Sequence, residues 1–243
     1  MKRVVIIQAR TGSTRLPGKV LMDLAGEPML GRQLRRLERC RRVDEIVVAT
    51  TRHAADDAIV SIARRYGVRW FRGDELDVLA RYIGAARESG AELIVRITSD
   101  CPLIDPEVVD RVVEALERRS STCDYAANVI ERSYPRGLDT EALYADTLER
   151  IGRLASSEAA REHVTHFIRE RPELFTVHSV VDDEDNSDLR WTVDTREDLE
   201  LVRRLYGRLE LDRRHVPYRA IVQFMRENPE LCAINSGVPQ KVP

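Results

Sequence analysis

Residues 3–19 read RVVIIQARTGSTRLPGK, a short apolar run that leads into a loop with two glycines and three basic residues. The run from Arg3 to Gln8 is continuous and rich in β-branched residues, which is typical of a strand buried on both faces. Similar runs recur at Glu45 to Thr51, Val68 to Phe71 and Ala91 to Thr98. The amphipathic stretches between them are predicted to be helices, at Pro28 to Cys40, Ala55 to Tyr66 and Asp77 to Glu88. This alternation predicts an α/β fold with a mostly parallel central sheet between two layers of helices.

The second half of the chain is less regular. Asp105-Pro106-Glu107 is a favourable helix start, because aspartate caps, proline suits the first helical position and glutamate suits the positive end of the helix dipole. Further strands are predicted at 124–129, 175–181 and 189–193, further helices at 142–153, 158–171, 195–208 and 217–227, and a polar tail after them. No linker is evident. We therefore expect one domain over residues 1–243, with an inserted or appended lobe around 130–190.

The composition and charge of the chain argue against several classes of protein. The formal net charge of −2 and pI of about 6.3 provide no overall basic field for DNA or RNA, so a nucleic-acid partner is not expected. No apolar run approaches the ~18 residues of a membrane helix, and the N-terminal run is too short for a signal peptide. The four cysteines are far apart in sequence and predict neither a zinc site nor a disulfide framework. We expect a cytoplasmic protein without a membrane partner.

The loop after the first strand is the strongest chemical signal. Arg10, Arg15 and Lys19 alternate with Gly12 and Gly18. Glycine lets backbone N–H groups approach an anion, and the basic side chains neutralise phosphate charge. The spacing fits neither a Walker A loop nor the GxGxxG pattern of dinucleotide folds. The loop is predicted to bind phosphate, and the alternative is a solvated basic surface loop.

Two aspartates follow apolar strands. Asp100 follows the strand that ends at Thr98, and Asp194 follows the predicted strand 189–193. Ligands bind at the carboxyl ends of parallel strands, where one or two carboxylates commonly hold Mg²⁺ against phosphate oxygens. The structural alternatives are an Asp100 that bonds turn amides and an Asp194 or Thr195 that caps a helix.

Two histidines, His163 and His166, lie three residues apart on a predicted helix. With no third ligand nearby, they are interpreted as a polar helix face rather than a metal site. The acidic run 182–185 is interpreted as a solvated turn, and no Gly-x-Ser-x-Gly elbow suggests a hydrolase.

At these motifs the chain resembles a known family. Residues 8–21 resemble the signature loop of the sugar-acid cytidylyltransferases, the CMP-Kdo and CMP-N-acetylneuraminate synthetases, and resemble more closely the spore-coat polysaccharide biosynthesis protein F branch. Segments 72–79, 96–105, 162–165, 190–198 and 228–231 resemble that branch as well, so the likeness spans nearly the whole chain. Gln8 replaces the usual proline of the loop, and Thr98 and Ser99 replace a usual glutamine and glycine.

The resemblance implies a Rossmann-like, three-layer nucleotide-diphospho-sugar transferase fold. It implies that Arg10 and Lys19 grip the triphosphate and that Asp100 and Asp194 hold Mg²⁺, with Arg10, Lys19 and Asp100 as the catalytic set. The residues implied in nucleotide binding are Ala9, Arg10, Gly12, Ser13, Arg15, Lys19 and Ser99, together with Arg72 and Asp77 in the segment that approaches the base. The second half of such chains carries dimer contacts, so a homodimer is expected.

The resulting hypothesis is a Mg²⁺-dependent cytidylyltransferase. It would transfer CMP from CTP to a sugar acid or related small acidic acceptor, with release of pyrophosphate, for surface polysaccharide biosynthesis. Two alternatives remain. One is a glycosyltransferase that uses a nucleotide sugar on the same fold, and the other is a non-catalytic nucleotide-binding protein.

Overall fold

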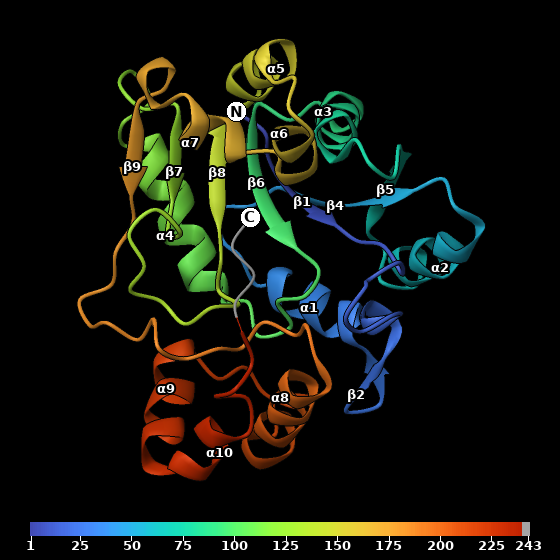
Figure 1. Cartoon of the computed structure of the whole chain (residues 1–243), viewed down its shortest axis with the longest axis vertical. Coiled ribbons are helices and arrows are strands. Elements are labelled where there is room, and N and C mark those ends of the chain that lie inside the picture. Colours follow the sequence, from blue (N-terminus) through green and yellow to red (C-terminus); the bar gives the residue numbers. More distant parts are fainter. Residues whose placement is uncertain (240–243) are drawn as a thin grey trace.

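A seven-stranded sheet forms the centre of the molecule (Figure 1). The structure is a computed structural model that describes residues 1–239. The strand order is β5-β4-β1-β6-β8-β7-β9. The strands are β1 (Arg3–Gln8), β4 (Glu45–Thr51), β5 (Arg69–Gly73), β6 (Leu93–Thr98), β7 (Tyr125–Ala127), β8 (Glu141–Tyr144) and β9 (Val177–Ser179). Strands β1, β4, β5 and β6 are mutually parallel, and β8 runs antiparallel to β6. The predicted α/β class with a mostly parallel sheet is confirmed.

Helices cover both faces of this sheet. They are α1 (Met29–Leu37), α2 (Asp57–Arg65), α3 (Val78–Ser89), α4 (Pro106–Glu117), α5 (Ala145–Leu154), α6 (Glu158–His163), α7 (His166–Glu170), α8 (Arg196–Leu209), α9 (Tyr218–Glu227) and α10 (Pro229–Ala233). Short 3₁₀ turns occupy η1 (Lys19–Leu21), η2 (Ala54–Asp56) and η3 (Pro172–Leu174), and β2 (Asp23–Leu24) pairs with β3 (Glu27–Pro28).

The central strand β1 explains the three layers. Its side chains alternate between two hydrophobic clusters, because successive residues of a strand point to opposite faces. Val5 and Ile7 pack with residues of α1, α2 and α4. Val4 and Ile6 pack with residues of α3, α5 and α7. Both faces are buried from Val4 to Ile7, which is why these four residues are all apolar.

A third hydrophobic cluster joins α8, α9 and α10 to the carboxyl-end side of the sheet, below it in Figure 1. Trp191 and Val193 are fully buried there. Asp105 caps α4 by accepting hydrogen bonds from the amides of Glu107 and Val108, as its sequence predicts. This cluster holds the segment 189–195 against the end of β6.

Several predicted elements are wrong in type or extent. The region 142–153 begins as strand β8, because Ala142 and Leu143 are buried on the sheet, and helix starts only at Ala145. The helix predicted over 158–171 breaks at Val164, whose φ is 51°. Segment 189–193 makes an isolated bridge, Arg136 with Arg190, instead of a strand. The predicted polar tail contains α10.

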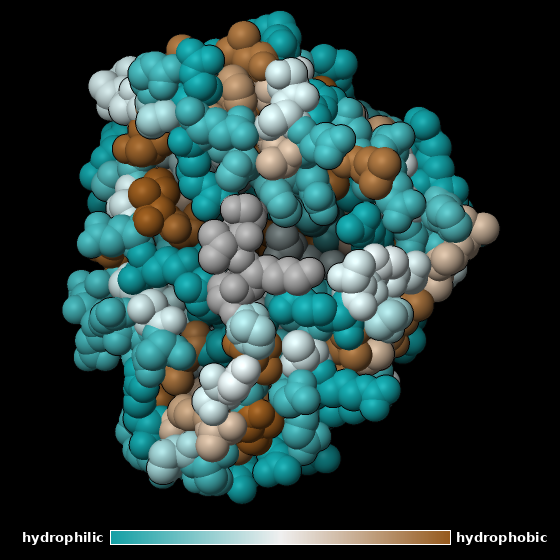
Figure 2. Space-filling view, in the orientation of Figure 1, coloured by the Kyte–Doolittle hydropathy of each residue, from teal (hydrophilic) through white to brown (hydrophobic). Residues whose placement is uncertain are grey.

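Residues 130–190, the region of the expected lobe, contribute β8 and β9 to the central sheet. Their expected part in acceptor binding and dimer contacts stays a prediction. Hydrophilic residues predominate on the face shown in Figure 2, with hydrophobic residues in small groups. No helix within residues 1–239 is long and apolar enough to cross a membrane.

Candidate active site

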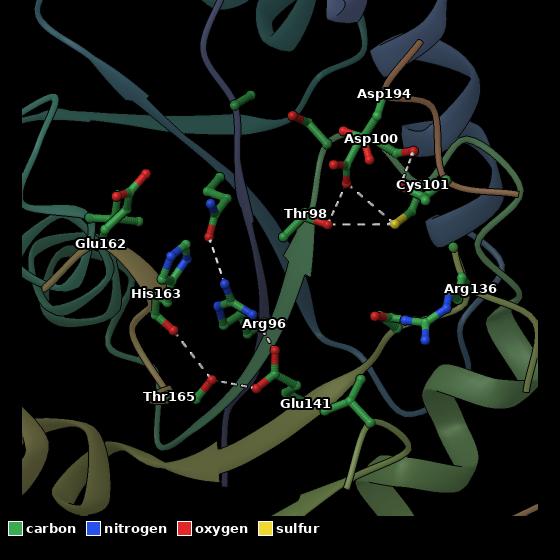
Figure 3. Close-up of a pocket in the computed structure, with 18 of the residues that line it drawn as sticks. Arg96, Thr98, Asp100, Cys101, Arg136, Glu141, Glu162, His163, Thr165 and Asp194 are labelled. Carbon is green, nitrogen blue, oxygen red and sulfur yellow. Dashed lines mark hydrogen bonds and ion pairs between the residues drawn. The ribbon is translucent and has the colours of Figure 1, made fainter. Parts of the chain in front are cut away.

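A cavity of about 740 Å³ opens at the carboxyl ends of β1 and β6. It is the position that a mostly parallel sheet offers to ligands. Its walls come from the loop after β1, from the turn after β6, and from segments far along the chain, including α6, the loop before β8 and the loop before α8. Figure 3 shows this convergence of side chains.

Backbone hydrogen bonds within the loop after β1 fold it into a compact turn. The carbonyl of Thr11 accepts from the amides of Ser13 and Gly18, both at 2.9 Å. Asp56 anchors the same residue by accepting from the Thr11 amide at 2.8 Å and from its hydroxyl at 2.7 Å. Gly18 adopts φ 71°, a left-handed conformation that favours glycine. The turn η1 then directs Lys19 into the protein, so the solvated-loop alternative does not describe this residue.

Lys19 lies between the two predicted aspartates. Its Nζ is 3.3 Å from Asp100 Oδ2 and 2.9 Å from Asp194 Oδ1, and it also donates to the Val193 carbonyl at 2.8 Å. Burial acts against the lysine's charge, but the two carboxylates raise the pKa of Lys19 above its ordinary value. The fold therefore brings together three charged groups that are up to 175 residues apart in sequence.

Asp100 makes no hydrogen bond to turn amides within the described chain. It accepts from the Thr98 hydroxyl at 2.5 Å and from Lys19, with the Cys101 thiol at 3.5 Å (Figure 3). Burial alone would raise the pKa of Asp100, but Lys19 and Thr98 hold that pKa below its usual value. The carboxylate is thus ionised and directed at the cavity.

Asp194 is not the cap of α8. Thr195 holds that position, in a capping box with Asp198. The Asp194 carboxylate instead forms ion pairs with Arg15 at 2.9 Å, Lys19 at 2.9 Å and Arg190 at 2.8 Å. The Asp194 side chain therefore caps no helix and binds three cationic side chains. This arrangement is suited to an electrostatic role.

A second group of charged side chains lines the cavity on the β8 side. Arg96 of β6 forms a buried ion pair with Glu141 of β8 and donates to Gln8 Oε1 at 3.2 Å. Glu141 also accepts from Tyr125 Oη at 2.6 Å and from the Thr165 hydroxyl. Burial opposes its charge, yet Arg96 lowers the pKa of Glu141. The sequence prediction missed this group, although a charged residue inside the apolar strand LIVRIT was a usable signal.

The loop before β8 contributes two arginines. Arg132 pairs with Asp139 through two contacts, of 3.0 and 2.8 Å. Arg136 lines the cavity without an ion pair within residues 1–239, and its backbone carbonyl accepts from the amides of Trp191 and Thr192 at 2.6 and 3.1 Å. These two hydrogen bonds attach the loop before β8 to Trp191 and Thr192, close to Asp194 in the chain.

Gly137 makes that pairing possible. Its φ is 106°, and a Cβ there would lie 2.6 Å from the amide nitrogen of Thr192. We expect Gly137→Ala to lower the free energy of unfolding by at least about 1–3 kcal/mol, the cost of such a backbone conformation for a non-glycine residue. The measurement is denaturant unfolding. Gly207→Ala is the control, because a Cβ at Gly207 meets nothing within 4 Å; equal losses in the two variants would contradict the assignment.

His163 lies on the cavity wall at the end of α6, opposite Asp100 in Figure 3. The next residue, Val164, is fully buried at φ 51°, a conformation that is rare for a β-branched side chain. Burial lowers the pKa of His163 further below neutrality, so the imidazole is uncharged at pH 7. His166 pairs with Glu170 at 3.5 Å. No group of three or more His, Cys, Asp or Glu side chains that could hold a metal ion occurs within residues 1–239.

Most of the residues implied in nucleotide binding or catalysis line the cavity: Ala9, Arg10, Ser13, Arg15, Lys19, Ser99, Asp100 and Asp194. Gly12 does not line it. Arg72 faces the other way, bonded to the carbonyls of Thr51 and His53 and to Asp57. Asp77 caps α3 and pairs with Arg161. The expectation that Arg72 and Asp77 contact the nucleotide is therefore not supported by their positions.

Comparison with known proteins agrees with this geometry. A cytidylyltransferase family model matches residues 4–221. The spore coat polysaccharide biosynthesis protein SpsF of Bacillus subtilis is 33% identical over 232 residues, which cover 93% of this chain and 94% of SpsF. The 3-deoxy-manno-octulosonate cytidylyltransferase of Geobacter sulfurreducens is 40% identical over 118 residues, 48% of this chain and 46% of that protein.

A solved cytidylyltransferase from Leptospira borgpetersenii superposes with a TM-score of 0.91 at 31% identity and covers 100% of this chain and 99% of its own. With the cavity, the cationic loop and the paired carboxylates in place, the molecule is a nucleotidyltransferase. More narrowly, the chain belongs to the cytidylyltransferase family.

Proposed function

We propose that this protein is a Mg²⁺-dependent cytidylyltransferase that transfers CMP from CTP to a sugar acid or a similar small acidic acceptor. The observation that carries the proposal is the meeting of Lys19, Asp100 and Asp194 on one cavity wall, next to the cationic loop. The names of the relatives support CTP as donor, since one of them is a 3-deoxy-manno-octulosonate cytidylyltransferase.

The cations of the loop are held by interactions that a triphosphate can replace. Within residues 1–239, Arg10 has only long ion-pair contacts, 3.5 Å to Glu75 and 3.9 Å to Glu162, both with partly exposed carboxylates. Arg15 and Lys19 bind Asp194, which has Arg190 as a further partner. In the proposed complex Arg10, Arg15 and Lys19 turn to the β- and γ-phosphates and neutralise the charge of the leaving pyrophosphate.

The aspartates fit the proposed Mg²⁺. Both reach the same cationic atom, Lys19 Nζ, and carboxylate oxygens are the hard ligands that this ion prefers. Within residues 1–239 there is no larger cluster of metal ligands, so phosphate oxygens and water must complete the shell, as is usual for Mg²⁺ in nucleotide sites. When bound, the ion would stabilise negative charge on the reacting phosphate.

The acceptor is proposed to bind on the β8 side of the cavity, where Arg132, Arg136 and Arg169 supply positive charge and His163 supplies a neutral imidazole. An acceptor oxygen attacks the α-phosphorus of CTP. The new P–O bond forms as the bond to the bridging oxygen of pyrophosphate breaks, in line with it. An acidic acceptor suits the excess of arginine on this wall.

The remaining parts of the proposal concern the biological role, the location and the oligomeric state of the protein. The name of SpsF supports a role in surface polysaccharide biosynthesis, in the cytoplasm, where CTP is available. The family resemblance of the second half of the chain supports a homodimer, which light scattering coupled to size exclusion tests directly.

With Mg²⁺ present, CTP should raise the melting temperature more than ATP or GTP does, because a pocket shaped for a pyrimidine excludes the larger purines. Thermal-shift measurements with the four nucleotides test this. Pyrophosphate release is then measured with CTP and a panel of sugar acids and phosphonates. Equal shifts from all four nucleotides would contradict the base preference. Turnover of a nucleotide sugar without pyrophosphate release would instead indicate a glycosyltransferase.

A further inference from the structure

One end of the cavity is bounded by helix α3, on the side of β4 and β5. Val78 and Arg81 of this helix line the cavity. They are three residues apart and therefore share a helix face. The Lys19, Asp100 and Asp194 group comes from other parts of the chain: the turn η1, the turn after β6 and the loop before α8.

Arg81 is an unusual arginine. It is 1% exposed, and it forms no ion pair with any carboxylate of residues 1–239. Its Nη1 donates to the Asp74 carbonyl at 2.7 Å. Its Nε is buried without a hydrogen-bond partner, and Nη2 makes no hydrogen bond within the described chain. Nε and Nη2 form one edge of the guanidinium, so a two-donor edge is left unsatisfied.

An unsatisfied buried charge is costly and calls for an explanation, and a ligand that accepts its hydrogen bonds is one. Burial lowers the pKa of Arg81 and the positive charge of Arg10 lowers it further, while Tyr82, Asp56 and Asp74 offset only part of this effect. Two nearby arginines differ in having carboxylate partners. Arg96, whose Nε also lacks a hydrogen-bond partner, forms an ion pair with Glu141, and Arg72 has three partners outside the cavity, including Asp57. Arg81, and not Arg72, is the arginine of the 72–81 segment that reaches the cavity.

We propose that Arg81 recognises the pyrimidine base of the bound nucleotide through its Nε and Nη2 edge. This inference rests on the proposed cytidylyltransferase function. Cytosine presents two adjacent acceptors, O2 and N3, which match two parallel donors. Uracil presents a donor, N3–H, in place of the second acceptor. One N–H of the guanidinium edge would then face another N–H and could not form a hydrogen bond. The apolar neighbour Val78 suits the flat base more than it suits a phosphate.

The experiment is titration calorimetry with CTP and with UTP, which have the same size and phosphate charge. Wild-type protein should favour CTP by roughly 5- to 150-fold, the range of a bidentate base contact. Arg81→Met and Arg81→Lys should bring the ratio close to one, the second while keeping the charge. Arg87→Met is the matched control, because Arg87 lies on the same helix but pairs with Glu149 at the surface.

A further measurement uses only the wild-type protein. Wild-type protein should bind 3-deaza-CTP, which lacks the N3 acceptor, about as weakly as UTP. An unchanged CTP to UTP ratio in the Arg81 variants, equal loss of both nucleotides, or full affinity for 3-deaza-CTP would each overturn the assignment of Arg81. Failure of wild-type protein to bind CTP at all would instead contradict the proposed function.

Discussion

Asp100→Asn and Asp194→Asn are each expected to lower turnover by orders of magnitude and to raise the Mg²⁺ requirement. Asparagine keeps the size of aspartate but loses the charge that a hard cation needs. Asp194→Asn also removes the carboxylate that competes with phosphate for Arg15 and Lys19. CTP without Mg²⁺ should therefore bind this variant at least as tightly as it binds wild-type protein. The melting temperature should change little, because Thr195 and not Asp194 caps α8.

The measurement is turnover against Mg²⁺ concentration, with CTP affinity measured in the presence and absence of the ion. The double variant should lose less than the product of the single effects, since residues that serve one ion act as a unit. Asp105→Asn is a matched control: it alters a buried cap of α4 outside the cavity, so it should affect stability and leave the Mg²⁺ curve unchanged. A normal Mg²⁺ curve for Asp194→Asn would leave Asp100 as the only protein carboxylate on the ion.

Lys19→Ala is expected to weaken CTP binding by roughly 1.5–3 kcal/mol, the scale of a charge-assisted hydrogen bond. The fold should survive, because Asp194 retains Arg15 and Arg190 as partners and Asp100 retains Thr98. The pKa of Asp100 should rise in the variant, since Lys19 is the main group that lowers it.

Calorimetry with CTP measures the effect. Lys2→Ala is the control, because Lys2 pairs with Glu45 away from the cavity. Unchanged CTP affinity in Lys19→Ala would show that the loop does not bind the triphosphate, whatever the identity of the base.

The class of fold and the main loop could be predicted because their signals are local. A strand buried on both faces is largely apolar, so β1, β4 and β6 are visible in the sequence as apolar runs. The loop 8–19 carries its glycines and cations within one short segment. The same reasoning failed at β8, since a short buried strand and the start of a helix have similar apolar patterns.

The sequence by itself determined the α/β sheet, the cationic loop after its first strand and the position of Asp100 directly after β6, because each depends on neighbours in the chain. Only the tertiary structure decided which charged groups meet. Lys19 lies between Asp100 and Asp194, and Arg96 pairs with Glu141 across 45 residues. It also decided that Arg72 faces away from the cavity while Arg81 borders it. The physical reason is that pairing of buried charges depends on strand order and helix packing, and neither is encoded in the spacing of residues along one segment.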